Sequence, residues 1–270
     1  MSKNYITILS IAGSDCSGGA GIQADIKTCD AIGVYAMTAI TAVTAQNTTG
    51  VKGFENVSHE MLRDQLEAIS DDCMPDAVKI GMLPTAKAVR IVADWLDLFA
   101  LDKVVVDPVM VATSGDALTQ SDTRRALEEH LFPLATIITP NIPEASILAE
   151  MQIDSMESLL EAGERLRGFT HSVLIKGGHG DNDVITDVLF EDNQPPRMLS
   201  HKRITTENTH GTGCSLSSAI ACHLAMGFPL SAAVERAIDW VHSAINAGKD
   251  FTFGNGHGPI NHNFNNSLFK

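Results

Sequence analysis

The sequence opens with a strand, a glycine-rich turn and a helix in residues 5–33, YITILSIAGSDCSGGAGIQADIKTCDAIG. The apolar run Tyr5–Ala12 is typical of a buried strand, and Gly18–Gly21 supplies a tight turn. Helical spacing runs from Ile22 to Ile32, and Gly33 is typical of a helix end. A strand–helix unit of this kind predicts a crossover to a parallel strand, in a sheet covered by helices.

The rest of the chain alternates strands and helices in the same way. Expected strands are Ala36–Ala45, Ala77–Ile80, Lys103–Val106, Thr136–Thr139 and Ser172–Lys176, and expected helices are His59–Ser70, Thr85–Phe99, Asp122–Leu131, Pro143–Glu150, Met156–Arg167, Gly213–Met226 and Leu230–Gly248. The run Ala36–Ala45 is expected to be buried on both faces of the sheet. A hairpin of Val184–Phe190 with Met198–Ile204 interrupts the alternation, and the tail Gly254–Phe264 is expected at the surface. We predict one α/β domain over residues 1–270, a three-layer α/β/α sandwich with a mostly parallel central sheet.

The composition excludes several classes of protein. The 270 residues are 44% hydrophobic and have a formal net charge of −14, which is typical of a globular, acidic chain. An acidic protein is a poor partner for nucleic acid or an anionic membrane, so neither is expected. The five cysteines form no CxxC pair, which argues against a disulfide framework or a zinc cluster and favours the cytoplasm. No apolar run is long enough to predict a membrane span.

Polar residues at the ends of the expected strands indicate a ligand site, because open parallel sheets bind ligands beyond the carboxyl ends of their strands. Asp107 and Glu144 follow two of these strands, and together they could hold magnesium and a triphosphate. Lys176 precedes two glycines, which suits a phosphate contact, although a solvated lysine is an equally good interpretation.

A second glycine-rich turn runs through Asn208-Thr209-His210-Gly211-Thr212-Gly213-Cys214 and opens a helix of small residues. Successive backbone N–H groups at such a turn, with the positive end of the helix, form an anion hole. Cys214 falls in the first turn, where a helix dipole lowers the pKa of a thiol. The alternative interpretation of Cys214 is a small buried apolar side chain.

The first turn matches a dinucleotide-binding pattern only formally. Gly19–Ala24 fits GxGxxA, but the acidic residue expected after the second strand is replaced by Gln46 and Asn47. We therefore interpret the turn as a close approach of the backbone to a small ligand, which Asp25 could reach from one helical turn further on.

Taken together, these motifs resemble the ribokinase-like superfamily, and in particular the hydroxymethylpyrimidine/phosphomethylpyrimidine kinases of thiamine biosynthesis. The matching runs are Ala12–Asp15, Ser17–Asp25, Ala45–Thr48, Lys79–Leu83, Asp107–Met110, Thr139–Glu144, Lys176–His179 and Thr209–Cys214. They occur in the family's order and cover residues 5–262, which makes the combination far more specific than any single motif.

The resemblance implies an ATP-dependent kinase with a ribokinase-like fold, usually a homodimer. It would phosphorylate the hydroxymethyl group of 4-amino-5-hydroxymethyl-2-methylpyrimidine and then phosphorylate the monophosphate, with Mg²⁺. The resemblance implies that phosphoryl transfer takes place at Gly211, Thr212, Gly213 and Cys214. It implies that the substrate is bound by Gly13, Asp25, Gln46, Met82 and Val109. Asn141 and Lys176 would contact the ATP phosphates, and Asp107 and Glu144 would bind the metal ion. The segment Thr113–Leu118 resembles a lid.

Three of these residues have more specific expected roles. Gln46 offers a donor beside an acceptor, which matches an aminopyrimidine edge. Asp25 would accept a hydrogen bond from the substrate hydroxyl. In the wider superfamily an aspartate acts as general base at the position of Cys214, so the base is either a Cys214 thiolate or absent, with direct attack by the hydroxyl.

Two other functions remain open at the level of sequence. One is a pyridoxal or pyridoxine kinase on the same scaffold. The presence of Gln46 together with Met82 favours a pyrimidine substrate over this alternative. The other is a non-catalytic pyrimidine-binding protein, which would not need the phosphate-binding residues Asn141, Glu144 and Lys176.

Overall fold

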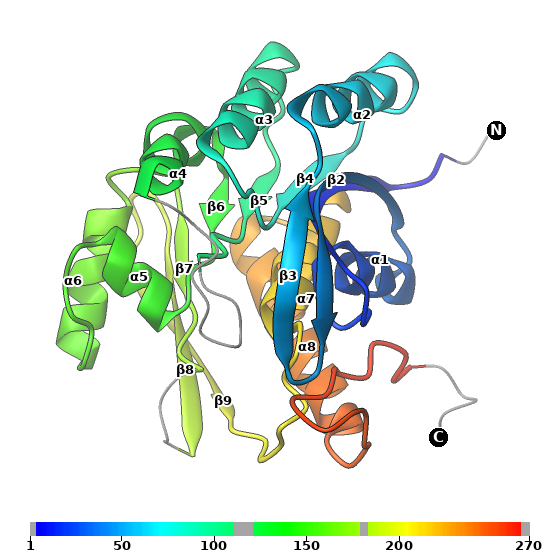
Figure 1. The fold of residues 1–270 in the computed structure, drawn as a ribbon. Coiled ribbons are helices and arrows are strands. Elements are labelled where there is room, and N and C mark those ends of the chain that lie inside the picture. The colour runs from blue at the N-terminus through cyan, green and yellow to red at the C-terminus, as the bar shows by residue number, and fades with distance from the viewer. Residues whose placement is uncertain (1–3, 111–120, 179–182, 266–270) are drawn as a thin grey trace.

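The computed structural model describes residues 4–110, 121–178 and 183–265. Its strands form one nine-stranded sheet in the order β3-β2-β1-β4-β5-β6-β7-β8-β9 (Figure 1). The strands are β1 (Thr7–Asp15), β2 (Tyr35–Asn47), β3 (Gly50–Asn56), β4 (Ala77–Ile80), β5 (Val104–Val106), β6 (Ile137–Ile138), β7 (Val173–Ile175), β8 (Val184–Phe190) and β9 (Arg197–Lys202). The six strands from β2 to β7 in this order run parallel, whereas β3 pairs antiparallel at one edge and β8 and β9 do so at the other.

Helices cover both faces of this sheet (Figure 1). One face packs on α1 (Gly21–Ile32), α7 (Thr212–Ala225) and α8 (Leu230–Gly248), and the other on α2 (His59–Asp72), α3 (Ala86–Leu98), α4 (Ser121–Ala126), α5 (Ile142–Leu148) and α6 (Met156–Leu166). Alternate residues of one strand enter opposite cores: Val105 packs toward α7 and α8, while Val104 and Val106 pack toward α3. The predicted three-layer sandwich with a mostly parallel sheet is confirmed.

Three local expectations are corrected by the structure. The edge strand β3 was not predicted, because its glycines and charged residues lower strand propensity and most of it is exposed. The neighbouring β2 is not buried on both faces as expected, since Val43 and Ala45 are exposed near that edge. The helix expected over Asp122–Leu131 consists of α4 followed by a π-helical turn, Leu127–Leu131.

The C-terminal tail also differs from the expectation of a surface segment. Ile260 and His262 are buried, and His262 Nε2 lies 3.0 Å from Ser215 Oγ at the start of α7. The backbone N–H of His257 donates to the carbonyl of Thr48, beyond the end of β2. The tail therefore joins the α7 region to the β2–β3 turn.

Two expected features, the lid at residues 113–118 and His179, lie outside the described residues. No helix of the part of the chain that the structure describes combines the length and apolar character needed to cross a bilayer.

Candidate active site

A cavity of about 620 Å³ opens where the parallel strands end. Residues at or just beyond the carboxyl ends of β1, β2, β5 and β7 line it, as do residues at the start of α7. Every residue predicted for the site lines this cavity except Asp25. The structure therefore brings together residues that lie up to two hundred positions apart, as the strand-end argument predicts.

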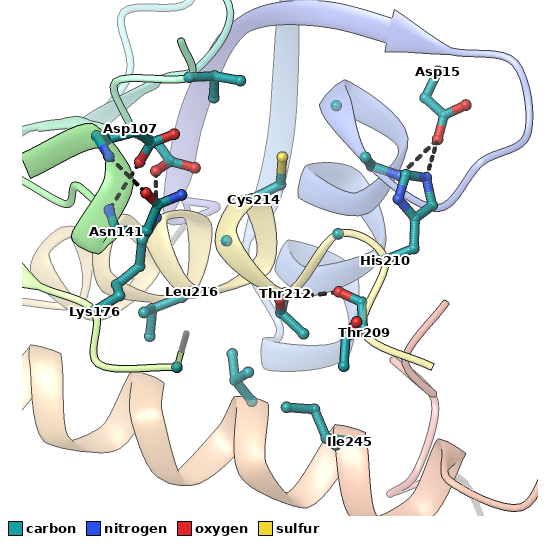
Figure 2. Close-up of a pocket in the computed structure, with 18 of the residues that line it drawn as sticks. Asp15, Asp107, Asn141, Lys176, Thr209, His210, Thr212, Cys214, Leu216 and Ile245 are labelled. Atoms are coloured by element: carbon teal, nitrogen blue, oxygen red, sulfur yellow. Dashed lines mark hydrogen bonds and ion pairs between the residues drawn. The ribbon is translucent and has the colours of Figure 1, made fainter. Parts of the chain in front are cut away.

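The turn before α7 places backbone N–H groups on the cavity. Gly211 has a φ of 82° and begins the helix in a left-handed conformation. A side chain at this position would collide with the carbonyl oxygen of Gly19, so only glycine fits. Thr212 Oγ1 donates to the carbonyl of Thr209 at 3.0 Å, which closes the turn (Figure 2). The N–H groups of Gly213 and Cys214 stand in the first helical turn, where no preceding helical carbonyl can accept from them.

Cys214 does not have the lowered thiol pKa expected from the helix dipole. Burial is the largest influence and raises the pKa of Cys214 to about 11. The charge of Lys79 and a hydrogen bond from the Gly21 N–H to the sulfur lower the pKa, but they do not outweigh burial. The side chain lies at the head of α7 (Figure 2) and is a neutral thiol at neutral pH.

The carboxylates of Asp107 and Glu144 lie near a partly buried lysine, Lys176. Lys176 Nζ donates to Asp107 Oδ1 at 2.8 Å (Figure 2). Thr139 Oγ1 donates to the same oxygen at 3.2 Å. Burial lowers the pKa of Lys176, but Asp107 and Glu144 outweigh it and raise that pKa. Burial and the nearby charge of Asp107 raise the pKa of Glu144 to about 7, against the opposing charge of Lys176.

Asn141 and Glu144 also begin a helix. The Asn141 N–H donates to Glu144 Oε2 at 2.8 Å, and the Glu144 N–H donates to Asn141 Oδ1 at 2.9 Å. This reciprocal pair is a capping box at the start of α5. The side chains of Asn141 and Glu144 therefore both cap α5 and line the cavity.

The cavity is also lined by Gly13, Gln46, Met82 and Val109. The Met82 carbonyl accepts a hydrogen bond from Thr41 Oγ1 at 2.7 Å, which holds the segment after β4 against β2. A side-chain carbon at Gly13 would lie 3.4 Å from the Met82 sulfur, so the two residues form one close-packed wall.

Asp15 and His210 join the two glycine-rich turns. His210 Nε2 lies 3.0 Å from Asp15 Oδ2 (Figure 2), and Asp15 also accepts from the N–H groups of Ser17, Gly19 and Ala20. Burial alone would raise the pKa of Asp15, but the hydrogen bonds, that from His210 foremost, hold it well below its usual range. Sequence reasoning gave neither residue a role, although both stand inside the quoted motifs.

Asp25 is not placed to meet a substrate hydroxyl, which corrects the expected role. It is fully buried and forms an ion pair with Lys79, whose Nζ lies 2.9 Å from Asp25 Oδ2. Ser10 Oγ and Ser218 Oγ donate to its two oxygens at 2.6 and 2.8 Å. The helical position that seemed to bring Asp25 to the ligand instead turns it into the sheet–helix core, where Lys79 compensates its charge.

No cluster of three or more His, Cys, Asp or Glu side chains that could hold a metal ion occurs within residues 4–110, 121–178 and 183–265. Asp107 and Glu144 are two carboxylates that line the same cavity, and magnesium is often bound by one or two carboxylates together with substrate phosphates and water.

The chain is similar to known proteins over most of its length. The family model described as phosphomethylpyrimidine kinase matches residues 15–261. The hydroxymethylpyrimidine/phosphomethylpyrimidine kinase of Rhizobium meliloti (strain 1021) is 48% identical, over 94% of this chain and 96% of its own length. The enzyme of the same name from Bacillus subtilis (strain 168) is 45% identical, over 94% of this chain and 93% of its own.

Solved structures share the fold. A phosphomethylpyrimidine kinase from Clostridium difficile superposes with a TM-score of 0.78 at 40% identity, covering 89% of this chain and 99% of its own. A pyridoxal kinase from Staphylococcus aureus, solved with AMP-PCP and pyridoxal, reaches 0.88 at 32% identity, covering 98% of this chain and 96% of its own. The resemblance seen in the motifs is confirmed: the chain belongs to the phosphomethylpyrimidine kinase family.

Proposed function

We propose that this chain is the ATP-dependent kinase that phosphorylates the hydroxymethyl group of 4-amino-5-hydroxymethyl-2-methylpyrimidine and then phosphorylates the resulting monophosphate to the diphosphate. The observation that carries the proposal is that one cavity is lined by the residues expected to bind the substrate, by those expected to bind phosphate and by the Gly211–Cys214 turn. The relatives that share about half of its residues carry the names of both kinase activities.

The nucleotide occupies the side of the cavity near Lys176. Asn141 and Lys176 contact its phosphates, and the apolar side chains of Leu216, Val241 and Ile245 line the cavity beside them and accept the base. An acidic chain with a net charge of −14 gains little from general attraction to ATP, so these local contacts must supply the affinity.

Magnesium fits the pair Asp107 and Glu144. Burial and the charge of Asp107 raise the pKa of Glu144 and so disfavour its ionised form, and a divalent cation held by Asp107 and Glu144 would relieve that cost. When bound, the ion neutralises charge on the nucleotide phosphates during transfer.

The pyrimidine occupies the wall formed by Gly13, Gln46, Met82 and Val109. Gln46 pairs with the exocyclic amine and its adjacent ring nitrogen, and the apolar members contact the faces of the ring. This orientation points the hydroxymethyl group toward the start of α7.

The transferred phosphoryl group is stabilised by the N–H groups of Gly213 and Cys214. These groups are fixed before the reaction, so they stabilise developing charge without reorganisation. Because Cys214 is a thiol at neutral pH, it is not the resting base. In a loose transition state the hydroxyl keeps its proton until late, and the proton can then pass to an oxygen of the transferred phosphoryl group, so direct attack needs no strong base.

A pyridoxal kinase activity is the second candidate, and the observation that favours it is the close superposition with the Staphylococcus aureus pyridoxal kinase. An ADP-release assay with the aminopyrimidine, with pyridoxal and without substrate separates the functions. We expect turnover of the aminopyrimidine and, by mass spectrometry, both the monophosphate and the diphosphate. Turnover of pyridoxal alone would overturn the proposal, and tight binding without ADP release would indicate a non-catalytic binding protein.

We further propose a homodimer in the cytoplasm. Exposed apolar side chains at the β2–β3 edge, Val43 on one face of the sheet and Phe54 on the other, support a subunit contact around that edge. All five cysteines are free thiols, which supports a reducing compartment. Sedimentation equilibrium at micromolar concentration tests the dimer, since a monomer mass would refute it.

A further inference from the structure

The side-chain amide of Gln46 lies between two polar neighbours at the cavity wall. Its Nε2 is 3.3 Å from His210 Nε2, and its Oε1 is 3.4 Å from Thr44 Oγ1. A half-turn of the amide exchanges nitrogen and oxygen at no steric cost, so the hydrogens on the two neighbours decide which end faces which.

The hydrogen at the His210 end is fixed by Asp15. The carboxylate of Asp15 is ionised and can only accept, so the hydrogen between it and His210 belongs to Nε2. A ring nitrogen that carries a hydrogen has no free lone pair. Toward Gln46, His210 Nε2 therefore offers no acceptor to an amide N–H, whereas the amide oxygen can share the Nε2 hydrogen with Asp15 in a three-centre hydrogen bond, so the partner that suits this end is the amide oxygen.

The hydrogen at the Thr44 end is fixed by Ser14. Thr44 Oγ1 donates its single hydrogen to the carbonyl oxygen of Ser14 at 3.0 Å. Toward Gln46 the hydroxyl can therefore only accept, and the partner that it requires is the amide nitrogen. Two independent neighbours thus demand the same orientation.

We propose that the pairs Asp15–His210 and Ser14–Thr44 lock the Gln46 amide with Oε1 toward His210 and Nε2 toward Thr44, which makes His210 and Thr44 specificity-determining positioning residues. The inference deepens the proposed function and rests on it. Each end of the amide keeps one unused partner for the cavity, an oxygen lone pair and an N–H, in a fixed order. That order matches an amine beside an unprotonated ring nitrogen.

The lock matters because the amide of an unconstrained glutamine can present its oxygen and nitrogen in either order. Turned over, it would pair equally well with the inverted edge of a pyrimidin-4-one, which has a ring N–H beside a carbonyl. Asp15, Thr44 and His210 are all buried, so water does not readily replace the partners that hold the amide. Gly19 lies directly against the His210 ring, where a side chain would collide, and this contact fixes the ring in place.

The test compares the aminopyrimidine with its 4-oxo analogue, 5-hydroxymethyl-2-methylpyrimidin-4-one. Both kcat/KM from ADP release and Kd from calorimetry are measured, in the wild-type protein and in T44V, T44S, H210F, H210Q and the double variant T44V/H210F. T44S keeps the hydroxyl, and H210Q supplies an amide that can donate to Asp15 and to Gln46, so both are conservative controls.

We expect the wild type to prefer the amine by at least about 100-fold, because two buried partners are mismatched in the analogue. T44V and H210F should each reduce the preference about tenfold, and the double variant should bring it within about tenfold of parity. T44S and H210Q should keep it. A purely structural role would change both substrates together and leave this ratio intact.

An unchanged ratio in T44V overturns the lock, even if H210F fails to fold, because T44S controls for packing at the same position. Equal binding of the two pyrimidines by the wild type, or binding of neither, also overturns it. A calorimetric preference for the amine without ADP release would instead overturn the kinase assignment and retain the lock.

Discussion

Replacing Asp25 by asparagine should destabilise the protein severely. Asp25 and Lys79 have side chains with 0% exposure, and both Asp25 oxygens lie within 3.0 Å of Lys79 Nζ. Asparagine keeps the volume but removes the charge, which leaves a lysine ammonium buried without a counter-ion. Two hydroxyl donors, Ser10 and Ser218, also lose a charged acceptor.

The size of the expected loss in unfolding free energy follows from the burial of this ion pair. Breaking a buried ion pair by removing one partner costs about 3–5 kcal/mol, a large part of the 5–15 kcal/mol that holds a typical domain folded. With a urea dependence of roughly 3 kcal/mol per molar, the unfolding midpoint should fall by about 1 M or more.

The assay is equilibrium unfolding in urea, followed by circular dichroism, with an exposed ion pair as the matched control. Arg165 and Glu161 lie 2.7 Å apart in α6 with exposures of 51% and 58%, and E161Q should cost less than about 0.5 kcal/mol. The double variant D25L/K79M removes both buried charges and should recover part of the loss, the remainder being the cost of the Ser10 and Ser218 hydroxyls left without their acceptor. Equal stability of D25N and E161Q would refute the interpretation of Asp25 as a structural residue.

Three other changes test the site. The raised pKa of Glu144 means that the folded, nucleotide-free protein binds this proton more tightly than the unfolded chain, so the stability that Glu144 contributes is lost as pH rises from about 4.5 to about 7. Urea unfolding at both pH values should show a loss on the order of 1–3 kcal/mol that is smaller in E144Q, in which the buried Asp187, with a pKa raised to about 6, still contributes; E144Q should also need more magnesium for turnover. Iodoacetamide at pH 7.5 should alkylate the exposed Cys16 and Cys73 before Cys214, which peptide mapping would show. The variant C214S should lower kcat less than about tenfold, because it keeps the backbone N–H groups of the turn. A loss of kcat on the order of 1,000-fold, the size of effect that a general base supplies, would instead show that the Cys214 thiol acts as the base. Q46L should lower kcat/KM for the aminopyrimidine by about one to two orders of magnitude and leave the KM for ATP unchanged, and unaltered pyrimidine kinetics would remove Gln46 from the substrate wall.

Most of the site could be predicted because its residues follow apolar strands. Asp107 comes directly after β5, Lys176 directly after β7, and Gln46 lies at the end of β2, so each is tied to a pattern that local sequence shows. Parallel strands then bring these ends to one edge of the sheet, and sequence distance ceases to matter.

The remaining features depend on partners that no local pattern reveals. Asp25 was expected at the ligand because it lies one turn into α1, but Lys79, 54 positions away, holds it in the core. The raised pKa of Cys214 likewise comes from burial by distant segments, which outweighs the helix dipole that sequence position suggests. The lock on Gln46 needs His210, which is 164 positions away.

The capping box at α5 shows why fold and site cannot be separated residue by residue here. Glu144 accepts the Asn141 N–H as part of the helix start, and its carboxylate also faces the cavity as one of two candidate metal ligands. Alanine at this position would remove the cap and the charge together, so lost activity would not distinguish a frayed helix from a lost ligand. Glutamine can still complete a capping box while lacking the charge. The charge of Glu144 and its role in the helix can therefore be separated by E144Q and not by alanine. For the same reason, T44S is the informative control for T44V, and H210Q is the informative control for H210F.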